Sequence, residues 1–205
     1  MRVEPLLDRT ALIEQLRREY AIEIVALTFL PKGFASHCYI AEDASGLRYF
    51  VKLCADTRIG RRNATLLDVS LPLLAALHQP DLFPNAPVPV KTVRGEFKSY
   101  FDGMACAVTY FIEGDTLVPD APVSDVVLAK IAQAAARIHC STDALDVSNL
   151  PVERFAIPIE DDLREGLAAL ETLTAQDSPA SHALRDLLLP RRDEVLRHLE
   201  RLRGL

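Results

Sequence analysis

Residues 47–54 read LRYFVKLC, a run of aromatic, branched and apolar residues that is typical of a β-strand but contains Lys52. Because side chains alternate along a strand, Lys52 shares a face with Arg48 and Phe50, and Tyr49 points the other way. A lysine in a strand is usually a solvated edge residue that discourages aggregation. The sequence on either side decides between that reading and a binding role.

The composition allows a sizeable core and limits the kinds of partner. The chain has 205 residues, of which 49% are hydrophobic, enough for one large domain or two small lobes. Its net charge of −6 argues against binding nucleic acid through bulk positive charge, but a nucleotide needs only a local positive site. Because the chain has few lysines, a surface lysine without a specific role is a weaker explanation for Lys52. The lysines are Lys32, Lys52, Lys91, Lys98 and Lys130.

The cysteines and the hydrophobic pattern indicate a protein of the cytoplasm. No cysteine pair has zinc-binding spacing, so we expect reduced thiols that are mostly packed in the core. These cysteines are Cys38, Cys54, Cys106 and Cys140. No run approaches the ~18 apolar residues of a membrane helix, so we expect no membrane partner.

The first half of the chain reads mostly as strands. Asp8 is suited to cap a first helix, and residues 62–78 predict a second one, whose final part would begin at Pro72. The loop PKGFAS follows the first predicted strand, and DASG marks the turn before the third. The predicted strands are 22–30, 37–42, 47–53, 88–93 and 104–111.

The second half of the chain reads as helix. Ser124 is suited to cap a helix over 125–139, residues 159–173 have helical spacing, and Ser178 begins a helical stretch with a break near Pro190. Strands in front and helices behind predict an α+β protein in two lobes. We expect these to be residues 1–112 and 113–205.

The loop that precedes Lys52 in the sequence favours a binding role for that lysine. Gly33 and Ser36 are small residues that let the backbone approach a ligand closely. A loop that covers phosphates, followed by a lysine on the third strand that reaches them, is the arrangement of kinases.

An ordered set of motifs gives this interpretation a family. The chain resembles the N-terminal part of the aminoglycoside phosphotransferase family, which has the protein-kinase-like fold. The resemblance covers residues 20–175 and is nearest to the spectinomycin phosphotransferase branch through YFVKL, SLPLLAALH and LPVERF. It implies a five-stranded antiparallel N-lobe and an incomplete helical C-lobe. The ordered motifs are FLPKGFASHCYI, YFVKL, VPVKTVRGEF, TYFIEGDTL and LAKIAQAAARIH.

The resemblance also implies a nucleotide site. The loop 31–36, with Gly33 and Ser36, would cover the nucleotide, Lys52 would bind the ATP phosphates, and Phe50 would contact the adenine. The hinge, whose backbone would bind the adenine edge, would be Tyr110, Phe111, Ile112 and Glu113. The alternative for FIEG is an ordinary strand end followed by a turn.

Several features of the family pattern are absent. The loop lacks two of the three kinase glycines, and no histidine begins an H-x-D catalytic loop. No aspartate introduces a D-F-G-like or D-x-D metal motif. Residues 61–78, where kinases carry the acidic partner of the lysine, contain no glutamate, so Asp68 is the candidate for that role.

These observations lead to one main hypothesis and two alternatives. We expect the N-terminal part of an ATP- and Mg²⁺-dependent kinase for a small hydroxyl-bearing substrate, inactive alone, with the Mg²⁺ ligands in a missing part. Helical faces around Leu188, Leu196 and Leu199 would then be exposed and promote self-association. Antibiotic resistance is an analogy only. The alternatives are a non-catalytic kinase-like protein that binds a nucleotide or partner, and an α+β domain unrelated to kinases.

Overall fold

The computed structural model describes residues 3–114, 117, 122–152, 157 and 159–203. The chain divides into two compact units, Met1–Leu150 and Pro151–Leu205, and each is described by itself. Two stretches quoted from the sequence, TYFIEGDTL and LPVERF, lie partly outside the described residues.

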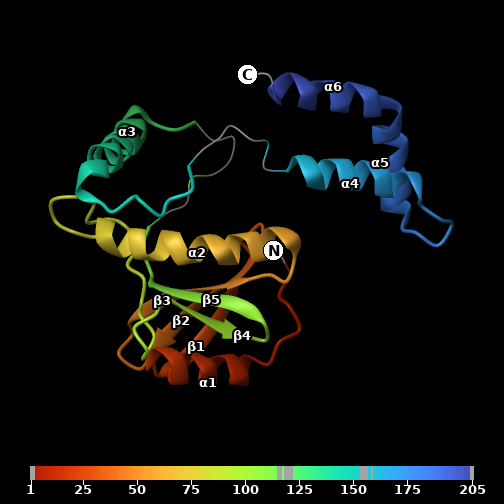
Figure 1. The fold of residues 1–205 in the computed structure, drawn as a ribbon. Helices are drawn as coiled ribbons and strands as arrows, with labels where there is room; N and C mark the ends of the chain where they lie inside the picture. Colours follow the sequence, from red (N-terminus) through yellow and green to blue (C-terminus); the bar gives the residue numbers. More distant parts are fainter. Residues whose placement is uncertain (1–2, 115–116, 118–121, 153–156, 158, 204–205) are drawn as a thin grey trace. The chain divides into compact units, whose positions relative to one another are not determined.

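The first unit is built on a five-stranded antiparallel sheet with the order β1-β2-β3-β5-β4 (Figure 1). The first three predicted strands and the last one are confirmed within one or two residues at each end. The strands are β1 Ile24–Leu30, β2 Ser36–Asp43, β3 Arg48–Cys54, β4 Lys98–Phe101 and β5 Met104–Tyr110.

The remaining strand lies elsewhere than the sequence predicted. The segment 88–93 forms only an isolated bridge, between Pro89 and Thr109, because a proline has no N–H to donate to a ladder. The fourth strand is instead β4, which a two-residue turn joins to β5. Asp102 and Gly103 form this turn with positive φ angles of 47° and 75°, the backbone twist that a tight hairpin favours.

Helices cover both faces of the sheet (Figure 1). Helix α1, Arg9–Tyr20, begins where the Asp8 carboxylate accepts hydrogen bonds from two backbone N–H groups, as the sequence predicted. Helix α2, Arg58–Leu77, packs on the opposite face. The prediction that Pro72 begins a separate part was wrong, since α2 continues through it.

Each helix closes its own part of the core. The larger cluster joins α1 to one face of the sheet through Leu12, Leu16, Tyr20, Ile22, Tyr39, Ala41, Tyr49, Val51, Leu53, Phe101, Cys106 and Val108. The smaller cluster joins α2 to the other face through Cys54, Leu67, Leu71, Ala105 and Ala107. Successive residues of β3 thus point into different clusters, as strand alternation requires.

Helix α3, Asp125–Cys140, follows in the same unit. The Ser124 hydroxyl accepts a hydrogen bond from the Val127 N–H at 3.4 Å, so the predicted cap is confirmed. None of the residues of α3 is buried. The apolar face predicted from its helical spacing is therefore present but uncovered by the described residues.

The second unit contains α4 Glu160–Glu171, α5 Pro179–Leu188 and α6 Arg192–Arg203. The cap at Ser178 and the break at Pro190 are confirmed. The expectation of exposed apolar residues needs a correction: Leu199 is only 5% exposed, whereas Leu184, Leu187 and Leu202 are open to solvent. Among the described residues, no helix is long and apolar enough to cross a membrane.

Candidate functional site

A row of paired residues crosses the face of the sheet that α2 covers. Lys52 on β3 lies opposite Cys38 on β2 and Ala107 on β5, and Ala107 also lies opposite Lys98 on β4. Cross-strand partners point to the same face, so the two lysines stand on either side of a small alanine, about 10 Å apart at their Cα atoms. The sequence predicted the face of Lys52 but not the second lysine.

Lys52 is partly buried and has no ion pair or hydrogen bond with another described residue. Its charge acts on the neighbouring thiol: burial raises the pKa of Cys38, and the Lys52 ammonium partly offsets that rise. An ammonium group without a carboxylate partner, held on a rigid strand, is available to an anionic ligand.

The other predicted nucleotide contacts are distributed around Lys52. Phe50 lies opposite Ile40 and Thr109 on the same face. Ser36 begins β2 and is buried opposite Cys54, at the end of β3 that is nearest to Lys52. Gly33 is exposed in the connection between β1 and β2, and its φ is not in the left-handed region. The structure brings Phe50 and Ser36 to one sheet face with Lys52, and Gly33 to the adjoining loop.

The predicted hinge, residues 110–113, leaves β5 at the end of the sheet opposite to Ser36. The Tyr110 N–H donates to the Val88 carbonyl at 2.9 Å, and the Phe111 N–H donates to the Arg48 carbonyl at 3.0 Å. The N–H groups of Ile112 and Glu113 make no hydrogen bond to another described residue. The donors left for a ligand in this segment are therefore these last two.

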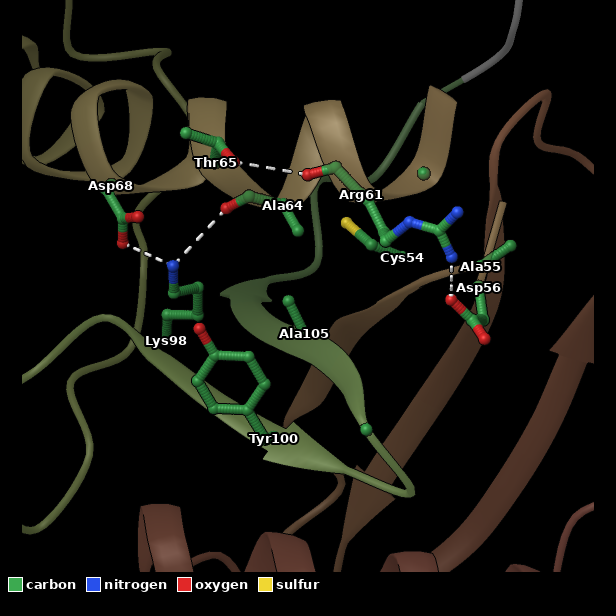
Figure 2. A pocket seen from close by; sticks show the side chains of 12 residues that line it. Cys54, Ala55, Asp56, Arg61, Ala64, Thr65, Asp68, Lys98, Tyr100 and Ala105 are labelled. Atoms are coloured by element: carbon green, nitrogen blue, oxygen red, sulfur yellow. Dashed lines mark hydrogen bonds and ion pairs between the residues drawn. The ribbon is translucent and has the colours of Figure 1, made fainter. Parts of the chain in front are cut away.

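Asp68 does not pair with Lys52, and this corrects the role assigned to it as the acidic partner of that lysine. Its carboxylate lies 2.5 Å from the Lys98 ammonium, which also donates to the Ala64 carbonyl at 3.4 Å (Figure 2). The pairing follows from the fold, because β4 brings Lys98 under α2. A contribution of Asp68 to cofactor binding remains a prediction.

A cavity of about 270 Å³ lies beside this ion pair, between α2 and the β4–β5 hairpin (Figure 2). Its polar lining residues are partnered with one another: Arg61 pairs with Asp56, and Lys98 pairs with Asp68. Lys52 is not part of its lining. This cavity is therefore distinct from the candidate nucleotide site.

Two residues of this region escaped the sequence analysis as functional candidates. Lys98 was missed because β4 was missed, although the Asp102-Gly103 dipeptide was a readable hairpin signal. Arg48 was noted only for its face, yet its guanidinium lies 4.6 Å from the centre of the Phe111 ring and pairs with the Glu113 carboxylate. Among the described residues, no three acidic, histidine or cysteine side chains gather to hold a metal ion.

No model of a known protein family matches this chain, and no curated protein matches it either. Solved structures do. One is spectinomycin phosphotransferase, APH(9)-Ia, in complex with ADP and spectinomycin, with a TM-score of 0.58, 16% identity, and coverage of 96% of this chain and 57% of that one. The AMP-bound complex of the same enzyme gives a TM-score of 0.56 and 16% identity, with 95% and 57% covered.

A third similar structure is amicoumacin kinase hAmiN in complex with AMP-PNP and Ca²⁺, with a TM-score of 0.51, 18% identity, and coverage of 95% of this chain and 54% of that one. The predicted fold class and the predicted likeness to the spectinomycin phosphotransferase branch are thus confirmed at the level of the fold. This chain spans little more than half the length of each of these proteins.

Proposed function

We propose that this chain is the nucleotide-binding part of an ATP-dependent phosphotransferase that acts on a hydroxyl group of a small molecule. One observation carries the proposal: Lys52 has no carboxylate partner among the described residues, it lies on the strand and face that also present Phe50, and this strand is hydrogen-bonded to the hinge segment. The bound ADP, AMP and AMP-PNP of the structures with the same fold support it.

In this proposal each group has a defined task. The Lys52 ammonium holds the phosphates as a point charge, Phe50 covers the base, and the β1–β2 connection with Gly33, which leads into Ser36 at the start of β2, lies over the phosphates. The backbone of Ile112 and Glu113 faces the base edge. Mg²⁺ would accompany ATP, but no acidic, histidine or cysteine cluster among the described residues fits a metal site.

We further propose that these 205 residues bind the nucleotide without transferring its phosphoryl group. A kinase needs an aspartate to position the acceptor hydroxyl, and no H-x-D motif occurs in the sequence. Incubation of the purified chain with ATP, Mg²⁺ and spectinomycin should therefore release no ADP above the background. ATP-dependent phosphorylation of the antibiotic by this chain would refute this part of the proposal.

The decisive experiment is calorimetric titration of the chain with ATP. Lys52→Ala should weaken binding at least about tenfold, because a charged hydrogen bond to phosphate contributes about 1.5–3 kcal/mol. Lys130→Ala removes an exposed lysine of α3 and serves as the matched control, with an affinity close to wild type. Equal affinities of the wild type and Lys52→Ala would remove the phosphate role of Lys52.

A second candidate function is a non-catalytic protein that binds a partner. The exposed apolar residues of α3, including Val126, Leu128 and Ile131, favour it. Such a surface would also support self-association of the chain. Absence of ATP binding together with a stable oligomer would favour this candidate. Binding of ATP by the chain would instead favour the kinase, which we propose to be a protein of the cytoplasm.

A further inference from the structure

On the β3 side, the hinge segment (residues 110–113) is contacted by Tyr49, which pairs with Tyr110, and by Arg48, which contacts Phe111 and Glu113. Arg48 makes three contacts with it: the carbonyl accepts from the Phe111 N–H at 3.0 Å, the guanidinium lies 4.6 Å from the Phe111 ring centre, and the same guanidinium pairs with the Glu113 carboxylate. The carbonyl contact is ordinary strand pairing. The other two depend on the side chain being arginine.

The position of Arg48 links the two ends of the proposed nucleotide site. Arg48 is the first residue of β3, and Lys52 lies on the same face four residues further on, about 13 Å away along the strand. One strand therefore carries the cation proposed for the phosphates and the side chain that fixes the hinge. The two backbone donors of the hinge that have no partner among the described residues, at Ile112 and Glu113, directly follow Phe111, whose ring the Arg48 guanidinium contacts.

We propose that Arg48 is a positioning residue for the base of the nucleotide. Its guanidinium holds Phe111 and Glu113. It thereby fixes where the backbone N–H groups of Ile112 and Glu113 lie relative to the face of β3 that carries Lys52. The inference rests on the proposed function and adds to it the residue that orients the hinge.

Stability alone does not account for this arrangement. The Arg48 side chain is 37% exposed and its partner Glu113 is 69% exposed, and ion pairs this open contribute little to folding. Removal of the guanidinium should thus leave the melting temperature nearly unchanged. Its effect should appear in binding of the base.

The test compares ATP with AMP, which shares the base but lacks the outer phosphates. In Arg48→Gln, the affinities for both ligands should fall by the same factor, about fivefold, the size expected from loss of a cation–ring contact and its ion pair. In Lys52→Ala, the loss should be larger for ATP than for AMP. Arg48→Lys keeps a cation over the ring and should restore part of the affinity.

Arg17→Gln is the matched control, because Arg17 pairs with Glu23 on an exposed surface at 2.8 Å and lies outside the proposed site. If Lys52→Ala weakens ATP binding but Arg48→Gln does not, the positioning role is refuted and the proposed function stands. A loss in Arg48→Gln that occurs for ATP but not AMP would also refute it, since Arg48 would then act on phosphates. If the wild type binds neither nucleotide, both proposals fall.

Discussion

At the scale of single residues, the two lysines beside Ala107 have different surroundings. The Lys98 side chain is only 15% exposed; burial lowers its pKa, but its hydrogen bonds to Asp68 and Tyr100 outweigh that effect and leave the pKa raised. Lys98 therefore stays charged and tied to α2. Lys52 has no such partner among the described residues, which leaves its charge for a ligand.

This difference predicts that Asp68 contributes to folding and not to nucleotide binding, contrary to the role assigned to it from the sequence. Asp68→Asn should lower the free energy of unfolding by about 1 kcal/mol, because the partly buried Lys98 loses its ion pair. ATP affinity should stay within about twofold of wild type, a change well below 1 kcal/mol. Urea unfolding and calorimetry measure the two effects.

Lys98→Met is the partner variant, and combining it with Asp68→Asn should cost less than the sum of the single changes. A loss of ATP affinity in Asp68→Asn as large as that in Lys52→Ala would show that the carboxylate serves Lys52 after all.

The raised pKa of Tyr49 predicts that the free energy of unfolding falls at high pH. The Tyr49 hydroxyl donates to the Asp43 carboxylate at 3.1 Å, and burial, followed by this bond, raises its pKa to about 12 from the ordinary value of 10.0. The folded state thus holds a proton that the unfolded chain releases above pH 10. The stability from this group is complete below pH 10 and is lost as the pH rises toward 12.

Unfolding measured from pH 9 to 12 should therefore show a steeper loss of stability in the wild type than in Tyr49→Phe. The two slopes should differ by about 1.4 kcal/mol per pH unit between the two pKa values, the value for one proton. Parallel curves would mean that Tyr49 titrates alike in both states.

At the scale of elements, local signals were sufficient for most of the chain. Asp8, Ser124 and Ser178 each marked a helix start, because a cap depends on neighbours two or three residues away. The segment 88–93 was mistaken for a strand because its valines have high strand propensity, whereas its prolines limit pairing. Propensity alone could not decide between 88–93 and β4 as the partner of β5.

The same reasoning explains what could be predicted of the site. Alternation alone placed Phe50 and Lys52 on one face of β3, and the structure agrees. The pair of Asp68 and Lys98 was beyond reach, because it depends on the register of β4 and on how α2 packs across it. The contact of Arg48 with Glu113 is equally non-local, since these residues are 65 positions apart.

At the junction of β3 and α2, Gly60 should not tolerate substitution by a residue with a side chain. A Cβ atom there would lie 1.9 Å from the Ala55 carbonyl oxygen, so Gly60→Ala forces the backbone to move. We expect a loss of about 2 kcal/mol or more, although alanine favours helices in general. Thermal unfolding followed by circular dichroism provides the measurement.

Gly166→Ala is the control in helix α4, where an added Cβ meets no atom within 4 Å. It should stabilise its helix by about 0.5–1 kcal/mol. Stabilisation by Gly60→Ala as well would show that the β3–α2 junction adapts more easily than its close contact implies.

At the scale of the whole molecule, the apolar residues of α3 predict association. Val126, Leu128 and Ile131 are each about half exposed or more, and solvated apolar groups gathered on one helix favour contact between chains. Sedimentation should show a weight-average mass above 22.7 kDa that rises with concentration. Ile131→Glu should shift the distribution toward the monomer, and a wild-type chain that stays monomeric at every concentration would contradict the prediction.

The reactivity of the four cysteine thiols would report which part of the first unit opens first. Cys140 is exposed, whereas Cys38, Cys54 and Cys106 are buried. Cys54 belongs to the cluster under α2, and Cys106 to the cluster under α1. A thiol reagent should react with Cys140 at once, and with Cys54 and Cys106 only when the helix that covers each of them moves away. The order in which Cys54 and Cys106 react would tell which face of the sheet opens first.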